Sequence, residues 1–179
     1  MSHINMGLAL RGSVEGDMAQ LTGMLEDAIA LLAMNNIDQW QKGSISSGIL
    51  LDAIRNDQGF VWEQRDATEI AGFCVLDTYD ELYEENLAKG KWTIEGPYLA
   101  IHRVMVSQHL RDRKVTRQMF LDIKKMGVVN NIASLRIDTH PDNVMMQKTL
   151  KRNGFVRTGL LYMPSGSPRY AYEFDLSQI

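Results

Sequence analysis

The chain has 179 residues, of which 45% are hydrophobic and 23% are charged, a composition typical of a globular protein with a buried core. Its formal net charge of -3 argues against general binding to nucleic acid or to a membrane surface. No stretch approaches the roughly 20 apolar residues that a membrane span needs, so we expect no membrane partner.

The first predicted elements are a short strand over residues 7–14 and a long helix over residues 15–36, whose apolar side chains recur at helical spacing. A shorter amphipathic helix follows over residues 46–56. Residues 59–79 have the pattern of two antiparallel strands joined by a polar turn. The acidic segment 77–91 is either a solvated helix face or a region that draws a cationic amine toward a site.

A strong strand is predicted over residues 97–107, followed by a basic turn and a helix that ends near Met126. A strand over residues 133–140 precedes a helix within 141–155, and a hairpin over 155–176 completes the order β-α-α-β-β-β-α-β-α-β-β. This order predicts one α/β domain around a mixed sheet. We assign this domain to residues 9–179 and expect residues 1–8 to be disordered or tag-like.

The single cysteine, Cys74, lies in an apolar predicted strand. It is either a buried thiol or a catalytic nucleophile, and burial is the commoner state of such a residue. The absence of a second cysteine fits a reducing compartment, and the N-terminus lacks the apolar region of a signal peptide. We therefore expect a cytoplasmic protein.

The stretch 106–119, VSQHLRDRKVTRQM, places cations where a helix begins. Cations there cost about 0.3–1 kcal/mol each, because a helix N-terminus carries partial positive charge. A bound anion would compensate them, and unpaired N–H donors at the same terminus favour anion binding. These cations are either contacts for an anion or solvated side chains: Arg111, Arg113, Lys114 and Arg117.

Together these elements resemble the GNAT N-acetyltransferase superfamily, from about Leu10 to Leu176. In the family's acetyl-CoA motif, a strand ending in V-x-V-S leads into a glycine-containing turn and a helix. Val104–Ser107 matches the strand end. A second family motif, an Asn followed eleven residues later by Gly-Phe, matches Asn143 and residues 154–155.

The resemblance implies a mixed, twisted sheet of about six to seven strands with flanking helices and a splayed central strand pair. It implies acetyl-CoA as cosubstrate and no metal. The pantetheine arm would pair with the strand and the pyrophosphate would lie on the turn, while Asn143 would contact the arm as well as cap its helix. The implied cofactor-binding residues are Val104, Met105, Val106, Arg111, Asp112, Arg113, Lys114, Val115, Thr116, Arg117 and Asn143.

The sequence departs from the family's acetyl-CoA motif at two positions of the turn, where Lys114 and Thr116 stand in place of the family's glycines. Glycine permits close backbone approach and positive φ, which a β-branched Thr resists. Either the turn keeps negative φ and basic side chains bind the anion, or the site has decayed.

The sequence also departs from the family at two catalytic positions. Leu150 stands where the family usually has a Tyr acid, and Ala100 stands where it often has a strand Glu. His102 is the predicted base, since it shares a strand face with Ala100 and a histidine side chain can act as a base near neutral pH; the alternative is a core histidine. Tyr162 is the predicted acid; the alternative, a half-buried strand Tyr without a catalytic role, is the commoner case. The predicted acceptor-binding residues are Trp40, Tyr98, Asp138 and His140.

Two of these acceptor assignments have a structural alternative. Trp40 is either a pocket wall or an aromatic plug between helices. Asp138 either faces the site, caps the following helix, or pairs with Arg136 or Arg152.

The resemblance implies an acetyl-CoA-dependent N-acetyltransferase that acetylates an amine of a small molecule or peptide by direct attack in a ternary complex. The alternative is a non-catalytic protein of the same fold that binds acyl-CoA or a partner. A nucleic-acid-binding module is disfavoured, because no aromatic residues interleave with the basic turn. A homodimer is a further expectation.

Overall fold

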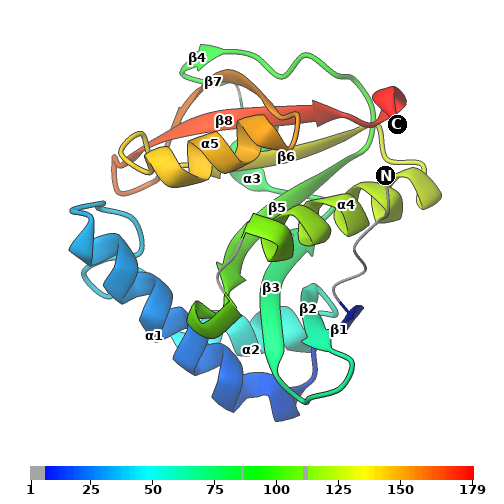
Figure 1. Ribbon diagram of the computed structural model, residues 1–179. Helices are drawn as coiled ribbons and strands as arrows, with labels where there is room; N and C mark the ends of the chain where they lie inside the picture. Colours follow the sequence, from blue (N-terminus) through cyan, green and yellow to red (C-terminus); the bar gives the residue numbers. More distant parts are fainter. Residues whose placement is uncertain (1–6, 86, 111–112) are drawn as a thin grey trace.

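The computed structural model describes residues 7–85, 87–110 and 113–179 (Figure 1). They form a single α/β domain around an open eight-stranded sheet in the order β1-β2-β3-β5-β6-β8-β7-β4. The strands are β1 Leu8–Gly12, β2 Gly59–Gln64, β3 Ile70–Asp77, β4 Lys89–Gly90, β5 Tyr98–Val106, β6 Ser134–Thr139, β7 Val156–Tyr162 and β8 Pro168–Asp175. The helices are α1 Met18–Met34, α2 Ser47–Arg55, α3 Glu81–Glu84, α4 Arg113–Val129 and α5 Val144–Arg152, with 3-10 turns η1 Glu15–Asp17, η2 Gln108–Leu110 and η3 Leu176–Gln178.

Every element predicted from residue spacing is present, and the predicted mixed sheet with flanking helices is confirmed. The acidic segment 77–91 differs from its prediction, because it contains the short helix α3 and the two-residue strand β4. The sheet therefore has eight strands instead of six to seven. Both additions are too short to carry a periodic pattern.

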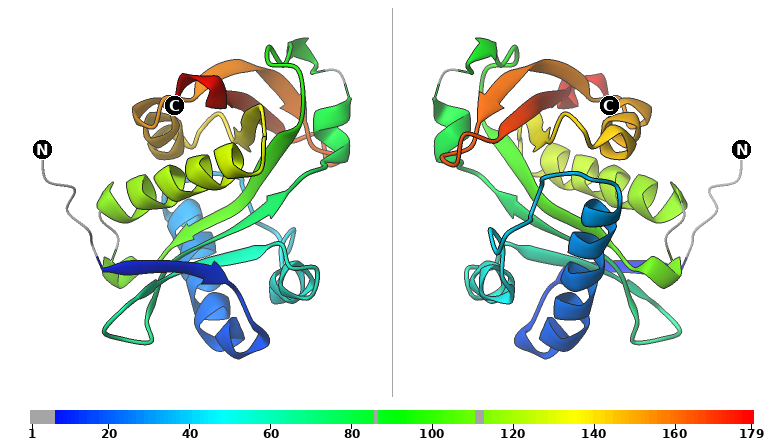
Figure 2. Two further views of the ribbon diagram at one scale, coloured as in Figure 1. Left: turned by 90° about the vertical axis from the view of Figure 1, so that its right-hand side faces the viewer. Right: turned by 90° about the vertical axis from the view of Figure 1, so that its left-hand side faces the viewer.

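The helices lie on both faces of the sheet (Figure 2). Helices α1 and α2 pack against β2 and β3 through one apolar cluster, while α4 and α5 pack on the opposite face through a larger one. Tyr83 of α3 forms a third cluster with Tyr98, Ala100, Leu161 and Ala171. Among the helices that the structure describes, none is long and apolar enough to cross a membrane.

The sheet divides between β5 and β6, which are the only parallel pair among the described strands. These strands pair over three positions, Tyr98–Ala100 with Ser134–Arg136, whereas β5 continues to Val106 beside β3. Figure 1 shows the two strands diverging beyond this contact. The splayed central strand pair is therefore confirmed, and one edge of β5 beyond Ala100 has no pairing with β6.

A β-bulge interrupts β5 within this divergent part. Phe73 pairs with Met105 and Val75 with His102, so two β5 residues, Arg103 and Val104, lie opposite one residue of β3. Arg103 adopts a φ of 55°, which is rare for a residue with a side chain. Bulges bend and twist the strand that contains them, which accounts for a change in direction of β5 at this point.

Cys74 lies in β3 opposite the bulge and is fully buried. Burial raises the pKa of its thiol, because a thiolate would be desolvated there. The prediction of a buried strand thiol is confirmed.

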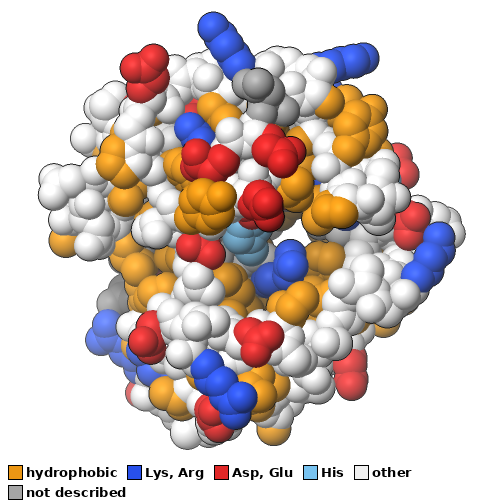
Figure 3. All heavy atoms as spheres, turned by 180° about the vertical axis from the view of Figure 1, so that it is seen from behind, with side chains coloured by type: hydrophobic (Ala, Val, Ile, Leu, Met, Phe, Trp, Pro, Cys, Tyr) orange, Lys and Arg blue, Asp and Glu red, His pale blue; other side chains and the backbone are white. Residues whose placement is uncertain are grey.

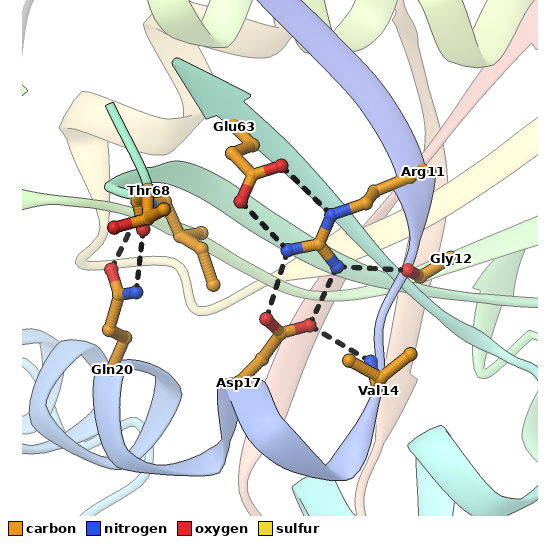
Figure 4. A network of polar contacts seen from close by, with 8 residues as sticks. Arg11, Gly12, Val14, Asp17, Gln20, Glu63 and Thr68 are labelled. Atoms are coloured by element: carbon orange, nitrogen blue, oxygen red, sulfur yellow. Dashed lines mark hydrogen bonds and ion pairs between the residues drawn. The ribbon is translucent and has the colours of Figure 1, made fainter. Parts of the chain in front are cut away.

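Arg11 joins the edge strand β1 to its two neighbours (Figure 4). Its Nη1 and Nη2 atoms donate to Asp17 at 2.8 and 2.9 Å, and its Nε and Nη2 atoms donate to Glu63 of β2 at 3.0 and 3.1 Å. Asp17 also accepts a hydrogen bond from the Val14 amide at 2.9 Å. We call these contacts of Arg11 with Asp17 and Glu63 the Arg11 clamp. The clamp fixes the start of α1 against the first hairpin of the sheet.

Candidate functional site

A cleft of about 1150 Å³ opens where β5 leaves β6. Its other walls come from the α1–α2 loop, the end of β6, the start of α5 and the β7–β8 loop. Figure 3 shows this face hollowed, with a histidine at depth, acidic side chains above it and basic side chains beside it. The β5 residues that line the cleft are Ile101, His102, Arg103, Val104, Met105 and Val106.

One half of the cleft has the geometry expected for an extended ligand. Val104, Met105 and Val106 line it, and the β5 edge there has no pairing with β6. Thr116, in the first turn of α4, lines the same region. An unpaired strand edge that leads to a helix N-terminus offers backbone hydrogen bonds and then a favourable dipole.

The basic turn is only partly covered by the structure. Arg111 and Asp112 lie outside the described residues, and so does the side chain of Arg113. Lys114 and Thr116 are helical, so this part of the chain keeps the negative φ that one of the two predicted alternatives requires.

The other turn residues differ in exposure. The side chains of Lys114 and Arg117 are exposed, while Val115 is 3% exposed in the core. The Val115 side chain is therefore not available to an anion. Contact between the basic side chains and a bound anion stays a prediction.

Asn143 caps α5 and lies in the cleft, as its predicted double role requires. Its Oδ1 accepts a hydrogen bond from the Met146 amide at 3.1 Å, which confirms the capping role. Its Nδ2 lies 3.3 Å from Oε1 of Gln39, in the α1–α2 loop across the cleft. This contact joins the loop to the start of α5.

His102 lies in the other half of the cleft beside a carboxylate. Its Nε2 is 3.0 Å from Oδ2 of Asp80, and each side chain is 20% exposed. Burial alone would raise the pKa of Asp80, but His102 and the amides of Tyr83 and Leu82 outweigh this effect and hold the pKa below its ordinary value. A neutral imidazole that donates from Nε2 to Asp80 keeps a lone pair on Nδ1, as a general base requires.

Asp138 also faces the cleft and is held by two neighbours. The Tyr83 hydroxyl donates to its Oδ2 at 2.6 Å, and Arg169 Nε lies 3.6 Å from its Oδ1. Burial raises the pKa of Tyr83, and the charge of Asp138 adds to this effect, so the phenol stays protonated. The predicted pairing of Asp138 with Arg136 or Arg152 is replaced by these contacts, since Arg136 pairs with Glu173.

Trp40 and His140 both line the cleft. Trp40 lies in the α1–α2 loop with a φ of 61°. His140 is 7% exposed, and its Nδ1 accepts a hydrogen bond from the Asp142 amide at 3.1 Å. Burial lowers the pKa of His140, and the nearby Arg169 lowers it further, so both effects favour the neutral imidazole.

Two predicted site residues lie elsewhere. Tyr98 is 6% exposed under α3, where its hydroxyl donates to Glu84 at 2.7 Å and accepts from the Asp80 amide at 3.0 Å. Tyr162 is 51% exposed on β7, outside the cleft lining. Neither residue lines the cleft, and the acceptor role of Tyr98 and the acid role of Tyr162 stay predictions.

Sequence reasoning missed four residues of the site: Asp80, Tyr83, Arg103 and Arg169. Asp80 belongs to the acidic segment, for which the sequence left open a solvated helix face or general attraction of an amine. Tyr83 and Asp138 are 55 residues apart, so no local spacing indicates their contact. In the part of the chain that the structure describes, no three His, Cys, Asp or Glu side chains are grouped to hold a metal ion.

No protein-family model matches the sequence, and no curated protein matches it. The fold is similar to a GNAT-family acetyltransferase from Streptococcus agalactiae 2603, with a TM-score of 0.80, 26% identity, and coverage of 94% of this chain and 95% of that chain. It is also similar to a GNAT-family acetyltransferase from Listeria monocytogenes 4b F2365, with a TM-score of 0.73, 17% identity and 98% coverage of both chains.

A third similar structure is the protein yncA from Salmonella typhimurium, solved with its cofactor acetyl-CoA. The TM-score is 0.65 at 11% identity, with coverage of 95% of this chain and 94% of that chain. The resemblance to the GNAT acetyltransferases is therefore confirmed over nearly the whole chain.

Proposed function

We propose that this chain of GNAT fold is an acetyl-CoA-dependent N-acetyltransferase that acetylates a primary amine. The observation that carries the proposal is one continuous cleft, which joins the open edge of β5 to the His102–Asp80 pair. A cosubstrate arm and an acceptor amine would meet within it. The acetyl-CoA bound by a similar structure supports the choice of cosubstrate.

The open β5 edge would hold the pantetheine arm as an additional strand. Val104–Val106 spans about 10 Å at the rise of an extended chain, which suits an arm with two amide groups. The pyrophosphate would lie at the start of α4, near Thr116, where helix amides and the basic turn favour an anion. Asn143 would contact the arm from the opposite wall.

His102 would remove the proton that the amine loses as it attacks the thioester. A C–N bond forms, the C–S bond breaks, and the CoA thiolate leaves and takes up a proton from solvent. Asp80, 3.0 Å from Nε2 of His102, would stabilise the imidazolium that results. A backbone N–H near Val106 would polarise the thioester carbonyl.

The second candidate is a protein that binds acyl-CoA without turnover. It is favoured by two positions where the family's usual catalytic residues would lie, Ala100 and Leu150, which are fully buried and apolar. Neither position can supply an acid or a base. The two candidate functions therefore differ in whether His102 acts as a base.

Thermal unfolding with acetyl-CoA, followed by an amine panel, tests the proposal. A ligand at a hundred times its Kd adds about 2.7 kcal/mol, which raises the melting temperature of a chain of this size by about 5–10 °C. CoA that lacks its 3′-phosphate measures the contribution of that phosphate. No shift at millimolar acetyl-CoA would exclude both candidates, whereas a shift without release of CoA thiol across the panel would select the second.

A further inference from the structure

Arg103 lies at the bulge in β5 and lines the cleft together with His102. Neighbouring residues of a regular strand point to opposite faces of the sheet. The bulge interrupts this alternation at Arg103. The left-handed φ of 55° at Arg103 is a cost, and such strain is concentrated at functional sites.

The other charged groups around Arg103 have partners. Asp80 is paired with His102, and Asp138 with Tyr83 and Arg169. Arg169 also donates from Nη1 to Ser167 Oγ at 2.6 Å and to the Pro168 carbonyl at 2.7 Å. Each of the two carboxylates is therefore already engaged by another side chain.

The Nε atom of Arg103 is left without such a partner. Its Nε is buried, and no hydrogen bond to it is formed within residues 7–85, 87–110 and 113–179. Burial lowers the pKa of the guanidinium, while Asp138, Tyr83 and Asp80 act to raise it, so carboxylates are near but not in direct contact. Buried polar groups in folded proteins are normally hydrogen-bonded, and Arg103 lines a space that a ligand can enter.

The chemistry of a guanidinium identifies the group that it would receive. Its planar donors match the two oxygens of a carboxylate, and the resulting charge-assisted pair is stronger than a neutral hydrogen bond. Consecutive Cα atoms are about 3.8 Å apart, so one small ligand can contact both His102 and Arg103. Such a ligand has its amine and its carboxylate close together.

We propose that Arg103 binds a carboxylate of the acceptor, which makes the acceptor an amino acid whose amine lies next to its carboxylate. The inference rests on the proposed N-acetyltransferase function. His102 and Asp80 would receive the amine, and Arg103 would orient it through the carboxylate. Acceptors of the same size without this carboxylate would bind more weakly.

Calorimetric titration of the full chain saturated with CoA tests the inference without turnover. The probes are L-leucine, L-lysine and L-glutamate, each compared with its α-carboxamide. We expect at least one acid to bind about ten- to a hundredfold more tightly than its amide, the range of a charge-assisted hydrogen bond. Arg103→Gln should weaken binding of the acid to that of the amide, and Arg103→Lys should restore part of the difference.

Lys42→Gln is the matched control, because it removes one positive charge from the cleft rim. The Lys42 side chain is 85% exposed and lies 3.7 Å from Asp38, so the acid-to-amide ratio should not change. Melting temperatures show whether each variant is folded. The inference is overturned if no acid binds at millimolar concentration, if acid and amide bind equally, or if the ratio persists in Arg103→Gln.

Parallel acetylation assays separate this inference from the proposed function. Equal acetylation of acids and amides would support the N-acetyltransferase function and contradict the contact between Arg103 and the carboxylate. The opposite result is a binding preference for the acid that is lost in Arg103→Gln, without acetylation of any probe or of the amine panel. It would support the carboxylate contact and contradict the enzymatic function.

Discussion

A histidine whose Nε2 is engaged by a carboxylate has one ring nitrogen left for proton transfer, and this is the state of His102. His102→Ala should lower kcat at neutral pH by about a hundredfold or more, the usual contribution of a general base. Asp80→Asn should lower kcat by less, because it removes the stabilisation of the imidazolium and not the base. Steady-state assays of both variants measure these effects.

The thermal shift with acetyl-CoA provides the control for both substitutions, since neither residue lies against the open β5 edge at Val104–Val106. That shift should stay within about 1 °C of the unmodified chain. An unchanged kcat in His102→Ala would remove this residue from the mechanism.

Asp122 of α4 has a structural role that a stability measurement can isolate. Trp62 of β2 is fully buried, and its Nε1 donates to Asp122 Oδ2 at 3.0 Å. Asp122→Ala should lower the free energy of unfolding by about 1–3 kcal/mol, because a buried donor is left unpaired. Denaturant unfolding measures the change.

Lys125→Ala is the comparison for Asp122→Ala. Lys125 Nζ lies 3.7 Å from Asp122 Oδ1, and its side chain is 63% exposed, so this ion pair contributes little. Its removal should change the free energy of unfolding by no more than about 0.5 kcal/mol. Equal effects of the two substitutions would contradict a special role for the Trp62 hydrogen bond.

At the scale of elements, the Arg11 clamp holds the edge strand β1 to β2 and to the start of α1. Arg11→Met should cost about 1–3 kcal/mol of stability, since Asp17 is 7% exposed and loses its charged partner. Arg55→Met is the matched control: Arg55 and Glu15 form a 2.9 Å pair with side chains 60% and 62% exposed. This exposed pair should contribute about 0–1 kcal/mol.

The clamp also predicts a pH dependence. The hydrogen bond from Arg11 holds the pKa of Asp17 below its ordinary value of 3.8. A lowered folded pKa stabilises the protein above the unfolded pKa, and the stabilisation is lost as the pH falls through the folded pKa. The difference in stability between the unmodified chain and Arg11→Met should therefore be constant above about pH 5 and shrink below pH 4; a difference that grows in acid would contradict the clamp.

The elements differ in how far the sequence predicts them. Long helices such as α1 carry several repeats of the helical pattern, and α5 is marked by its cap at Asn143 and its end at Gly154. By contrast, α3 has four residues, and β4 forms only through its pairing with Leu160 and Gly159 of β7. Partners distant in sequence determine such elements, and one sequence does not reveal those partners.

The site residues divide in the same way, into those set by local sequence and those set by distant partners. His102 and Asn143 were predicted, because a strand face and a helix cap are local properties. Arg103 was not, because strand alternation places it opposite His102, and only the bulge changes this. The exposure of Tyr162 was not predictable, because its position in the hairpin did not reveal which face of β7 it occupies.

At the scale of the whole molecule, two half-sheets meet at three residue pairs between β5 and β6. A ligand that pairs with the open edge of β5 would extend this contact. Acetyl-CoA should therefore slow hydrogen exchange of the cleft-side amides within Ile101–Val106 by about tenfold or more, because those amides gain acceptors. Exchange measured by NMR tests this directly.

The hairpin of β7 and β8 provides the internal reference for this exchange measurement. Its strands are paired along their length and should show little change on binding. Equal slowing throughout the molecule would indicate general stabilisation and contradict an added strand at β5.

The burial of Cys74 has a practical consequence for experiments on this protein. It is the only cysteine in the chain, and a thiol reagent can reach it only when the centre of the sheet opens. A chromogenic disulfide should therefore detect released CoA without a signal from the folded protein, and one further thiol per chain after denaturation. The rate at which that thiol is labelled in native buffer would then report how often the sheet opens, with no probe introduced.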